Sequence, residues 1–296
     1  MILRIKFFTK KVIKSAYVIA VGLSGLGFLI RLATRRRKRL AILMYHKVTQ
    51  DPGESYYCVT KSNFERQVKY LKSAFDIVSI SDVRDYVTGK AELDKNSCCI
   101  TFDDGYGDIY TQVLELAKKN GIPIAVGLVS DYVDKDKEFS WDKMFKLKDR
   151  KLLNWAQIRE LLAAQAAFGS HSATHANLAS LNDNELRYET VDSRRAIETM
   201  TGRVAFFFIY PFGASANIDL RVTEAVRKAG YAVALTSIWG WVRRDSDPYM
   251  LRRINVDGSD TMLTFKAKLS GVFDILGIFD SCPYEFARRI ITNIFK

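Results

Sequence analysis

From residue 40 onward, the sequence alternates short apolar runs with segments whose apolar residues recur at helical spacing, and this pattern narrows the possible folds sharply. The runs predict buried strands, and the periodic segments predict helices. Repeated alternation is typical of parallel strands with helices outside. The expected strands are 40–46, 97–102, 122–130, 166–171, 204–213 and 231–237, and the expected helices are 63–75, 107–121, 154–165, 182–202 and 218–230.

The formal charge of +12 is concentrated at the amino terminus. Residues 1–39 hold 11 of the 45 basic residues and no acidic residue, which leaves 34 basic against 33 acidic side chains in the rest of the chain. An almost neutral body argues against nucleic acid as a partner, because a groove that tracks phosphates is basic. The sequence predicts three parts: a basic region over 1–39, a folded domain over 40–270 and a C-terminal amphipathic helical segment over 271–296.

Residues 12–33 form an apolar stretch inside the basic region, and its only charges, Lys14 and Arg31, lie near its ends. Long cationic side chains can reach the membrane interface from such positions, and the stretch is about long enough to cross a bilayer as a helix. No cleavage signal is evident before the RRRKR run, so an uncleaved single-pass membrane anchor is expected. The alternative is an interfacial helix that lies on the membrane. We expect an extracytoplasmic folded domain, but cations on both sides of the stretch leave its orientation open.

The four cysteines form no CxxC metal or redox motif. Cys98 and Cys99 are neighbours on an expected strand, so their side chains should point to opposite faces and not bond each other. Cys58 and Cys282 could pair, but nothing in the sequence requires it.

Two adjacent carboxylates, Asp103 and Asp104, follow the apolar run 97–102 in the order TFDDG. Neighbouring anions repel each other, and their removal from water is costly unless a cation or hydrogen-bond donors compensate. The alternative is that Asp103 caps a helix while Asp104 faces solvent. Neighbours on a strand point opposite ways, so both carboxylates reach one site only if the strand has already turned. Gly105 gives the backbone that freedom.

Two of the three histidines, His171 and His175, lie in the run GSHSATH at the end of another expected strand. Their spacing predicts both imidazoles on one side of a helical turn, where they can share a metal ion. Two surface histidines without a ligand are the alternative. Parallel sheets place their chemistry at the carboxyl ends of strands, where TFDDG, GSHSATH and IYPFG all fall. Two imidazoles and one carboxylate would bind a divalent cation and leave positions for water and substrate.

These ordered motifs resemble those of the polysaccharide deacetylases, the NodB-homology or carbohydrate esterase family 4 enzymes. The resemblance covers about residues 40–258 through ITFDDGY, NWAQIRELL, GSHSATHANL, SRRAIETMTG, FFFIYPFG and DPYMLRRINV. The YPFG loop and the N-terminal LMYH strand are similar to one subgroup of the family. The fold that this resemblance implies is α/β, a distorted (β/α)7 barrel of the NodB type, here preceded by the expected membrane-anchor helix.

The family pattern also implies roles for the strand-end residues. Asp103 would be the general base, and the metal ligands would be Asp104, His171 and His175. The implied cofactor is a divalent cation, Zn²⁺ first, with Co²⁺, Ni²⁺ or Fe²⁺ as alternatives. The implied reaction is hydrolysis of an N-acetyl group on an amino sugar, with the metal polarising the carbonyl and Asp103 accepting a proton from water.

The loop after the strand at 204–209 is implied to bind the substrate and its oxyanion, with Phe212 at the aromatic position whose backbone N–H polarises the amide oxygen. The residues of this loop are Tyr210, Pro211, Phe212 and Gly213. Many family members carry an arginine just before this motif to hold the catalytic aspartate, and here that place is Ile209. Arg253 is the candidate replacement, and the alternative is that Arg253 forms a surface salt bridge.

No histidine follows residue 175, so the C-terminal acid usual in the family is missing. His46 is the remaining histidine, and in a closed barrel the first strand neighbours the last. We therefore expect protonated His46 to donate a proton to the leaving amine. The alternative is a packed or strand-end histidine with a satisfied hydrogen bond.

Together these features predict a metal-dependent hydrolase that removes N-acetyl groups from amino sugars of a cell-surface polysaccharide or a lipid-linked glycan precursor. One alternative keeps the metal site but changes the acyl group, as in deformylation of a lipid-linked sugar. A second alternative is a glycan-binding relative that has lost turnover, and the intact carboxylates and histidines argue against it. The expected partners are an N-acetylated glycan and, through residues 12–33, the membrane.

Overall fold

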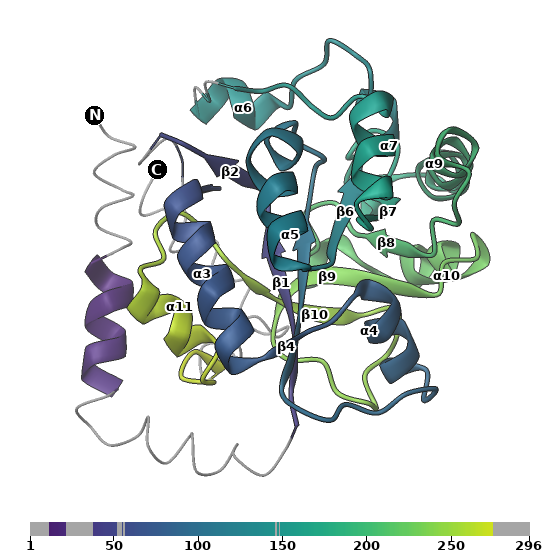
Figure 1. Ribbon diagram of the computed structural model, residues 1–296. Helices are drawn as coiled ribbons and strands as arrows, with labels where there is room; N and C mark the ends of the chain where they lie inside the picture. Colours follow the sequence, from purple (N-terminus) through teal and green to yellow (C-terminus); the bar gives the residue numbers. More distant parts are fainter. Residues whose placement is uncertain are drawn as a thin grey trace, which may run out of the picture.

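The computed structural model describes residues 12–21, 38–51, 55, 57–145, 147 and 149–274, and its centre is a closed ring of parallel strands (Figure 1). Around the ring the order is β1, β10, β9, β8, β7, β6 and β5, and β5 pairs again with β1. The seven strands are β1 (Leu40–Tyr45), β5 (Ser97–Phe102), β6 (Ile124–Leu128), β7 (Ala167–Ser170), β8 (Phe207–Ile209), β9 (Val233–Trp239) and β10 (Leu251–Asn255). The predicted parallel (β/α)7 barrel is confirmed.

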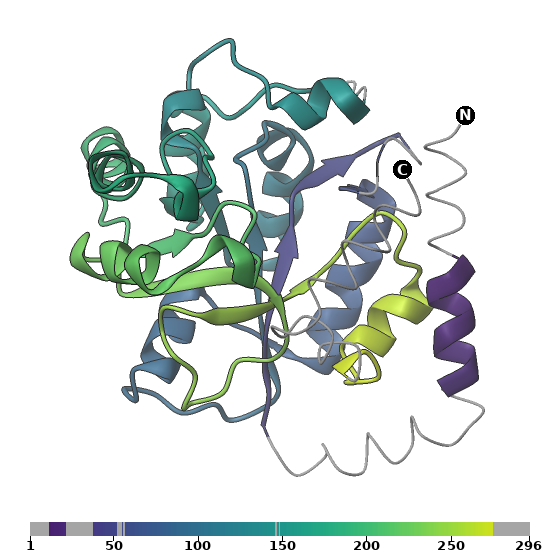
Figure 2. The same ribbon diagram turned by 180° about the vertical axis from the view of Figure 1, so that it is seen from behind.

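Helices surround the barrel and return the chain to the start of the next strand (Figures 1 and 2). The predicted helices are present as α3 (Lys61–Ala74), α5 (Leu114–Asn120), α7 (Trp155–Ala163), α8 (Asp183–Arg187), α9 (Ser193–Thr201) and α10 (Leu220–Lys228). Two of the predicted segments contain a π-helical part, η1 (Ile109–Val113) and η4 (Tyr188–Asp192). The elements that the sequence analysis did not predict are β2 (Lys47–Thr49), β3 (Cys58–Thr60), β4 (Asp76–Ile77), α4 (Ile80–Val87), α6 (Ser140–Phe145), α11 (Met262–Lys268) and the strand β10.

Side chains alternate along the strands between the inside of the barrel and the helices outside it. Cys98 packs in a cluster that includes residues of α3, α5 and α7, whereas Cys99 packs with residues of β1, β6, β8, β9 and β10. The two cysteines therefore point to opposite faces, as predicted; Cys282 lies outside the described residues. Counting by two from Cys99 and from Leu251 leads to Asp103 and Arg253, so both of these charged side chains belong to the inner face.

Residues 12–21 form a helix that packs on the barrel domain. Val18 and Val21 are buried in a small cluster with Ala267 of α11 and with the following residues Val272 and Phe273. Within the described part of the chain, no helix is both long and apolar enough to cross a bilayer. The structure therefore does not support the predicted anchor over 12–33: its described half covers a protein surface, and residues 22–33 lie outside the described residues.

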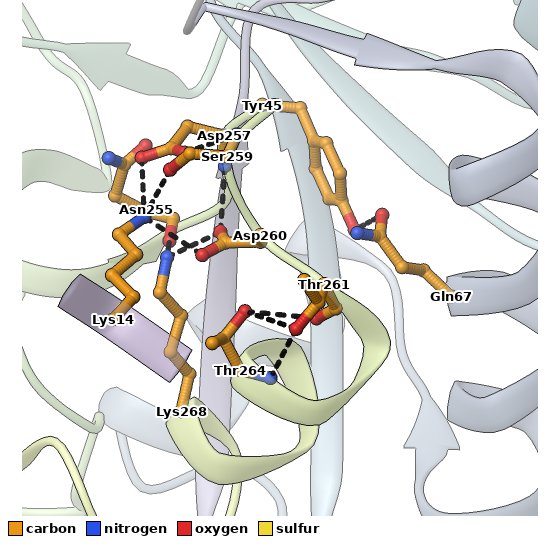
Figure 3. A network of polar contacts seen from close by, with 10 residues as sticks. All are labelled: Lys14, Tyr45, Gln67, Asn255, Asp257, Ser259, Asp260, Thr261, Thr264 and Lys268. Carbon is orange, nitrogen blue, oxygen red and sulfur yellow. Dashed lines mark hydrogen bonds and ion pairs between the residues drawn. The ribbon is translucent and has the colours of Figure 1, made fainter. Parts of the chain in front are cut away.

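Lys14 joins this helix to the turn after β10 (Figure 3). Its Nζ donates at 2.9 Å to a carboxylate oxygen of Asp257, to a carboxylate oxygen of Asp260 and to the hydroxyl of Ser259. The other oxygen of Asp260 accepts from Nζ of Lys268 in α11 at 2.5 Å. Two lysines thus neutralise two buried carboxylates, and the helix over 12–21 contacts the domain that was predicted to begin at residue 40.

We expect Lys14→Ala to lower the free energy of unfolding by about 1–3 kcal/mol, because two buried carboxylates would share one remaining lysine. Urea unfolding of the full chain measures this change. Lys118→Ala is the matched control, since Lys118 pairs with Glu115 at an exposed position and should change stability by less than about 0.5 kcal/mol. Equal effects of the two substitutions would contradict the assignment of Lys14 as a structural contact.

Candidate active site

The residues singled out from the sequence come together at one rim of the barrel. His46 follows β1, Asp103 and Asp104 follow β5, His171 follows β7, and the loop 210–213 follows β8. Because all the strands of the ring are parallel, their carboxyl ends share this rim, which is where barrels of this kind hold their chemistry.

Arg253 holds Asp103 through two parallel hydrogen bonds. Its Nη1 donates to Oδ1 of Asp103 at 2.6 Å, and its Nη2 donates to Oδ2 at 2.7 Å. The same guanidinium also donates through Nε to the carbonyl oxygen of Thr236 at 2.6 Å and through Nη1 to the hydroxyl of Thr101 at 3.2 Å. Arg253 is only 1% exposed, so the alternative of a surface salt bridge is wrong. The cation that Asp103 requires comes from β10.

This contact sets the protonation state of Asp103. Burial by itself would raise the pKa of this carboxyl group, because a low-dielectric surrounding disfavours the anion. The charge of Arg253 and its hydrogen bonds outweigh burial and hold the pKa at about 2. Asp103 is therefore ionised at neutral pH, as a proton acceptor must be.

Asp104, His171 and His175 converge on one point. One potential ligand atom from each lies within 4.8 Å of the other two. Oδ1 of Asp104 is 3.3 Å from Nε2 of His171 and 3.5 Å from Nε2 of His175. Burial raises the pKa of Asp104, but the hydrogen bond from His171 and the charge of His175 bring it below its ordinary value. A carboxylate and two imidazoles form a donor set that suits Zn²⁺ and similar divalent cations.

The orientation of the two imidazoles fits a cation. Nδ1 of His171 lies 2.8 Å from the carbonyl oxygen of Ile209. A carbonyl oxygen only accepts, so Nδ1 carries a proton. Nε2 faces Asp104, donates to its carboxylate when the imidazole is protonated, and would be the ligand atom for a bound cation. Burial and the charge of His171 lower the pKa of His175 to about 4, so His175 is neutral at pH 7. Neutral imidazoles with a fixed tautomer are the form that binds metals.

The segment between the histidines is an irregular turn, so the helical turn predicted from their spacing is wrong. Ser172 and His175 have positive φ angles of 66° and 62°, a region that residues other than glycine rarely adopt. This turn brings the two imidazoles together, with ring centroids 4.7 Å apart. At the end of β5 the chain turns as predicted, but Asp104 shares the positive φ of 71° with Gly105.

The loop 210–213 lies beside the second histidine. The ring of Phe212 is half exposed, and its centroid is 4.9 Å from that of His175. Gly213 has a φ of 59°, and a Cβ there would come 2.5 Å from the backbone nitrogen of Ser237. Tyr210 points away from the site, because its hydroxyl donates to the carbonyl oxygen of Tyr249. In the loop predicted to bind substrate, the ring of Phe212 lies next to His175, whereas the Tyr210 side chain points away from the site.

His46 lies at the same rim, directly after β1. Tyr45 and Phe102 are paired in register, which places His46 opposite Asp103. Burial and Arg253 are the main influences on the pKa of Asp103, and His46 adds a smaller lowering contribution. The side chain of His46 is partly exposed, with its ring 5.4 Å from that of Tyr57. Partial exposure contradicts a fully packed core histidine. The alternative of a strand-end histidine is not excluded, and the role of His46 as the acid stays a prediction.

An aromatic wall formed by Phe139 and Trp141 also packs against His175, with Trp141 next to Phe212, and the sequence analysis missed it. The wall lies in the lysine-rich stretch between the expected strand 122–130 and the expected helix 154–165, where the sequence predicts no element. Trp141 stacks on Phe139 at 4.5 Å, and its ring is 4.7 Å from that of His175. Asp142 anchors the segment, since it accepts hydrogen bonds from the hydroxyl of Tyr106 at 2.7 Å and from the backbone N–H of Phe139 at 3.2 Å. The signal in the sequence was FSWD, an aromatic and acidic run that interrupts the lysines.

Known proteins are similar to this chain in sequence. Residues 90–234 match the family model described as polysaccharide deacetylase. YxkH of Bacillus subtilis, which is assigned to the polysaccharide deacetylases, is 25% identical over 224 residues that cover 75% of this chain and 73% of that protein. Poly-beta-1,6-N-acetyl-D-glucosamine N-deacetylase of Escherichia coli is 25% identical over 228 residues, which cover 66% of this chain but only 33% of the enzyme.

The fold has solved counterparts as well. The deacetylase PplD of Streptococcus pyogenes, solved in complex with acetate, superposes with a TM-score of 0.65 at 18% identity, over 74% of this chain and 93% of that chain. The matched segment 90–234 includes Asp103, Asp104, His171, His175 and the loop 210–213. The chain therefore belongs to the polysaccharide deacetylases, the NodB-homology or carbohydrate esterase family 4 hydrolases.

Proposed function

We propose that this chain is a metal-dependent N-deacetylase that removes acetyl groups from polymers of N-acetylglucosamine. The observation that carries the proposal is the arrangement of two functions on one rim: Asp103 is clamped by Arg253, and the metal-binding group of Asp104, His171 and His175 lies beside it. The printed substrate of the Escherichia coli relative supports the choice of polymer. Membrane attachment through residues 12–33, of which the structure describes only 12–21, is not supported by the structure, and an extracytoplasmic domain stays a prediction.

Asp104, His171 and His175 would hold the divalent cation, most suitably Zn²⁺ for this donor set. When bound, the cation supplies a Lewis acid that polarises the acetamide carbonyl. Asp103 accepts a proton from the attacking water, and Arg253 keeps its carboxylate ionised and fixed in direction. The products are acetate and a free amine.

Two further groups complete the reaction. The backbone N–H of Phe212 lies in the loop beside His175 and donates to the oxygen that becomes negative as water adds. Protonated His46, opposite Asp103, donates a proton to the amine nitrogen as the carbon–nitrogen bond breaks. The partly exposed ring of Trp141, which stacks on the buried ring of Phe139, can support the apolar face of a sugar ring.

Release of acetate from β-1,6-linked N-acetylglucosamine oligomers tests the function. The chain is stripped with a chelator and then supplied with Zn²⁺, Co²⁺, Ni²⁺ or Fe²⁺ in turn, and we expect activity to disappear and return. Matched N-formyl oligomers distinguish a deformylase, which would release formate and no acetate. A glycan-binding relative would retain the oligomers without releasing acid. Absence of acetate with every metal would overturn the proposal.

We expect His46→Ala to fold and bind metal like the wild type but to lose about 10²–10⁴-fold in turnover, the usual contribution of a general acid. The loss arises because nothing then protonates the leaving amine. His46→Gln is the companion variant, since it keeps a polar side chain that cannot transfer a proton to the leaving amine. Near-normal turnover in both variants would show that His46 is not the acid.

A further inference from the structure

A buried carboxylate that is not among the metal-binding residues holds the turn between the two histidines. Oε2 of Glu189 accepts hydrogen bonds from the backbone N–H of Ala173 at 2.8 Å and from that of Thr174 at 2.9 Å. Its Oε1 accepts from the Thr174 hydroxyl at 2.6 Å. Three donors from two consecutive residues of the turn 171–175 thus end on one side chain.

The turn needs this support because its backbone is strained. Ser172 and His175 both occupy the positive-φ region, and such conformations persist only where the surroundings hold them. Two serine hydroxyls contribute: Oγ of Ser170 accepts from the N–H of Ser172, and Oγ of Ser172 accepts from the N–H of His175, both at 3.0 Å. These bonds lie within the turn, whereas Glu189 ties it to a different element.

Glu189 reaches the turn from η4, the π-helical segment between α8 and α9. A π segment changes the helical register locally, and such segments occur often at functional sites. Ser193, at the start of α9, bonds through its hydroxyl to that of Ser170 at 2.8 Å. One helical stretch therefore holds both the end of β7 and the middle of the turn.

Glu189 itself depends on these contacts. It is only 4% exposed, so its carboxylate has lost most of its water and relies on the three donors. Conversely, the N–H groups of Ala173 and Thr174 point inward to Glu189, and a buried N–H without an acceptor is unfavourable. The interaction stabilises one shape of the turn more than any other.

We propose that Glu189 is a positioning residue of the metal site, which fixes the turn 171–175 in the shape that directs His175 toward Asp104. This inference rests on the proposed metal function of that site. Glu189 acts through Ala173 and Thr174 and does not contact the metal-binding atoms. Its loss should weaken binding without abolishing it, because the Ile209 carbonyl still orients His171. Partners of this kind typically contribute about 10–100-fold to metal affinity.

The test measures metal affinity directly, on the full chain. Calorimetric titration with Zn²⁺ gives the affinity, the visible absorption of added Co²⁺ reports the ligand geometry, and the thermal midpoint of the metal-free protein reports folding. Glu189→Leu should bind Zn²⁺ about 10–100-fold more weakly and change the Co²⁺ spectrum. Glu189→Gln should recover most of the affinity, since its amide oxygen accepts both N–H groups and its NH₂ donates to the Thr174 hydroxyl.

Glu198→Leu is the matched control. Glu198 lies in the same helical stretch and accepts hydrogen bonds from the N–H of Ala205 at 3.1 Å and from Nε of Arg194 at 2.9 Å, away from the turn. Its loss should lower the thermal midpoint and leave the Zn²⁺ affinity unchanged. Glu189→Asp, which keeps the charge but shortens the side chain, replaces the leucine variant if that protein does not fold, and it too should bind Zn²⁺ more weakly.

The outcomes separate the two proposals. Wild-type protein that binds none of the metals overturns the proposed function and this inference with it. Wild-type protein that binds Zn²⁺ while the folded Glu189→Leu or Glu189→Asp protein binds it equally well overturns the inference alone. Equal loss of affinity in Glu189→Leu and Glu198→Leu also overturns it, because that result indicates a general effect on folding.

Discussion

Asp104→Ala is expected to abolish metal binding and deacetylation together, whereas Asp103→Asn should abolish turnover and leave the metal bound. Asp104 supplies one of the three ligand groups that the described residues offer at the site, and His171→Ala should behave in the same way. Asp103 lies next to Asp104 in the chain, but both of its oxygens bond to Arg253. A proton acceptor contributes about 10²–10⁴-fold to the rate without holding the metal.

Two measurements on the same purified proteins decide this prediction: the metal content after dialysis, and the rate of acetate release. Because the two carboxylates are adjacent and equally buried, each variant is the control for the other. Circular dichroism and the thermal midpoint show whether each variant folds. Asp104→Ala protein that kept both metal and activity would refute the assignment of ligands, and active Asp103→Asn protein would refute the assignment of the base.

Arg253→Met should lower the free energy of unfolding by about 3–5 kcal/mol, because it leaves the charge of Asp103 buried without a partner. It should also raise the pKa of Asp103, since the largest influence that opposes burial is then gone. At neutral pH we expect kcat/KM to fall by about 10²-fold or more, as the base becomes protonated or loses its orientation. Arg253→Lys keeps the positive charge but cannot bond both oxygens of Asp103. Its stability and its kcat/KM should therefore lie between those of the wild type and those of Arg253→Met.

The effect of Arg253→Met should depend on pH, because the lowered pKa of Asp103 contributes to stability only where this carboxyl group is ionised. The pKa of Asp103 is lowered from 3.8 to about 2 in the folded protein, so its ionisation contributes stability at pH values above the unfolded value, and this contribution disappears as the pH falls toward 2. In Arg253→Met that contribution is lost, and the acid limb of the kcat/KM profile should move to higher pH. Arg252→Met is the control, because the neighbouring Arg252 is exposed and donates to the carbonyl oxygen of Trp239. An unmoved acid limb in Arg253→Met would contradict the role of the clamp.

The sequence alone determined the order of six barrel strands and of the predicted helices between them, but not β10, and it indicated the three residues that could bind a metal. Both are local properties: hydrophobic period distinguishes strand from helix, and strand ends carry the carboxylates and imidazoles. It also indicated that Asp103 required a cation and that Arg253 was a candidate. The parallel arrangement followed from the alternation, and parallel strands bring their carboxyl ends to one rim whatever the details of packing.

The tertiary structure decided what depends on contacts between distant segments. Arg253 and Asp103 are 150 residues apart and meet only because β10 and β5 both border β1 in the closed ring. The turn 171–175 takes its strained shape from Glu189 on another element, which spacing within the motif cannot reveal. Residues 12–21 have the composition of a membrane segment, yet they pack on α11 because Asp257 and Asp260 offer partners to Lys14. An apolar sequence with one lysine can pack against a membrane or against a protein surface. The sequence of residues 12–21 does not distinguish these two, and the contacts of the folded chain do.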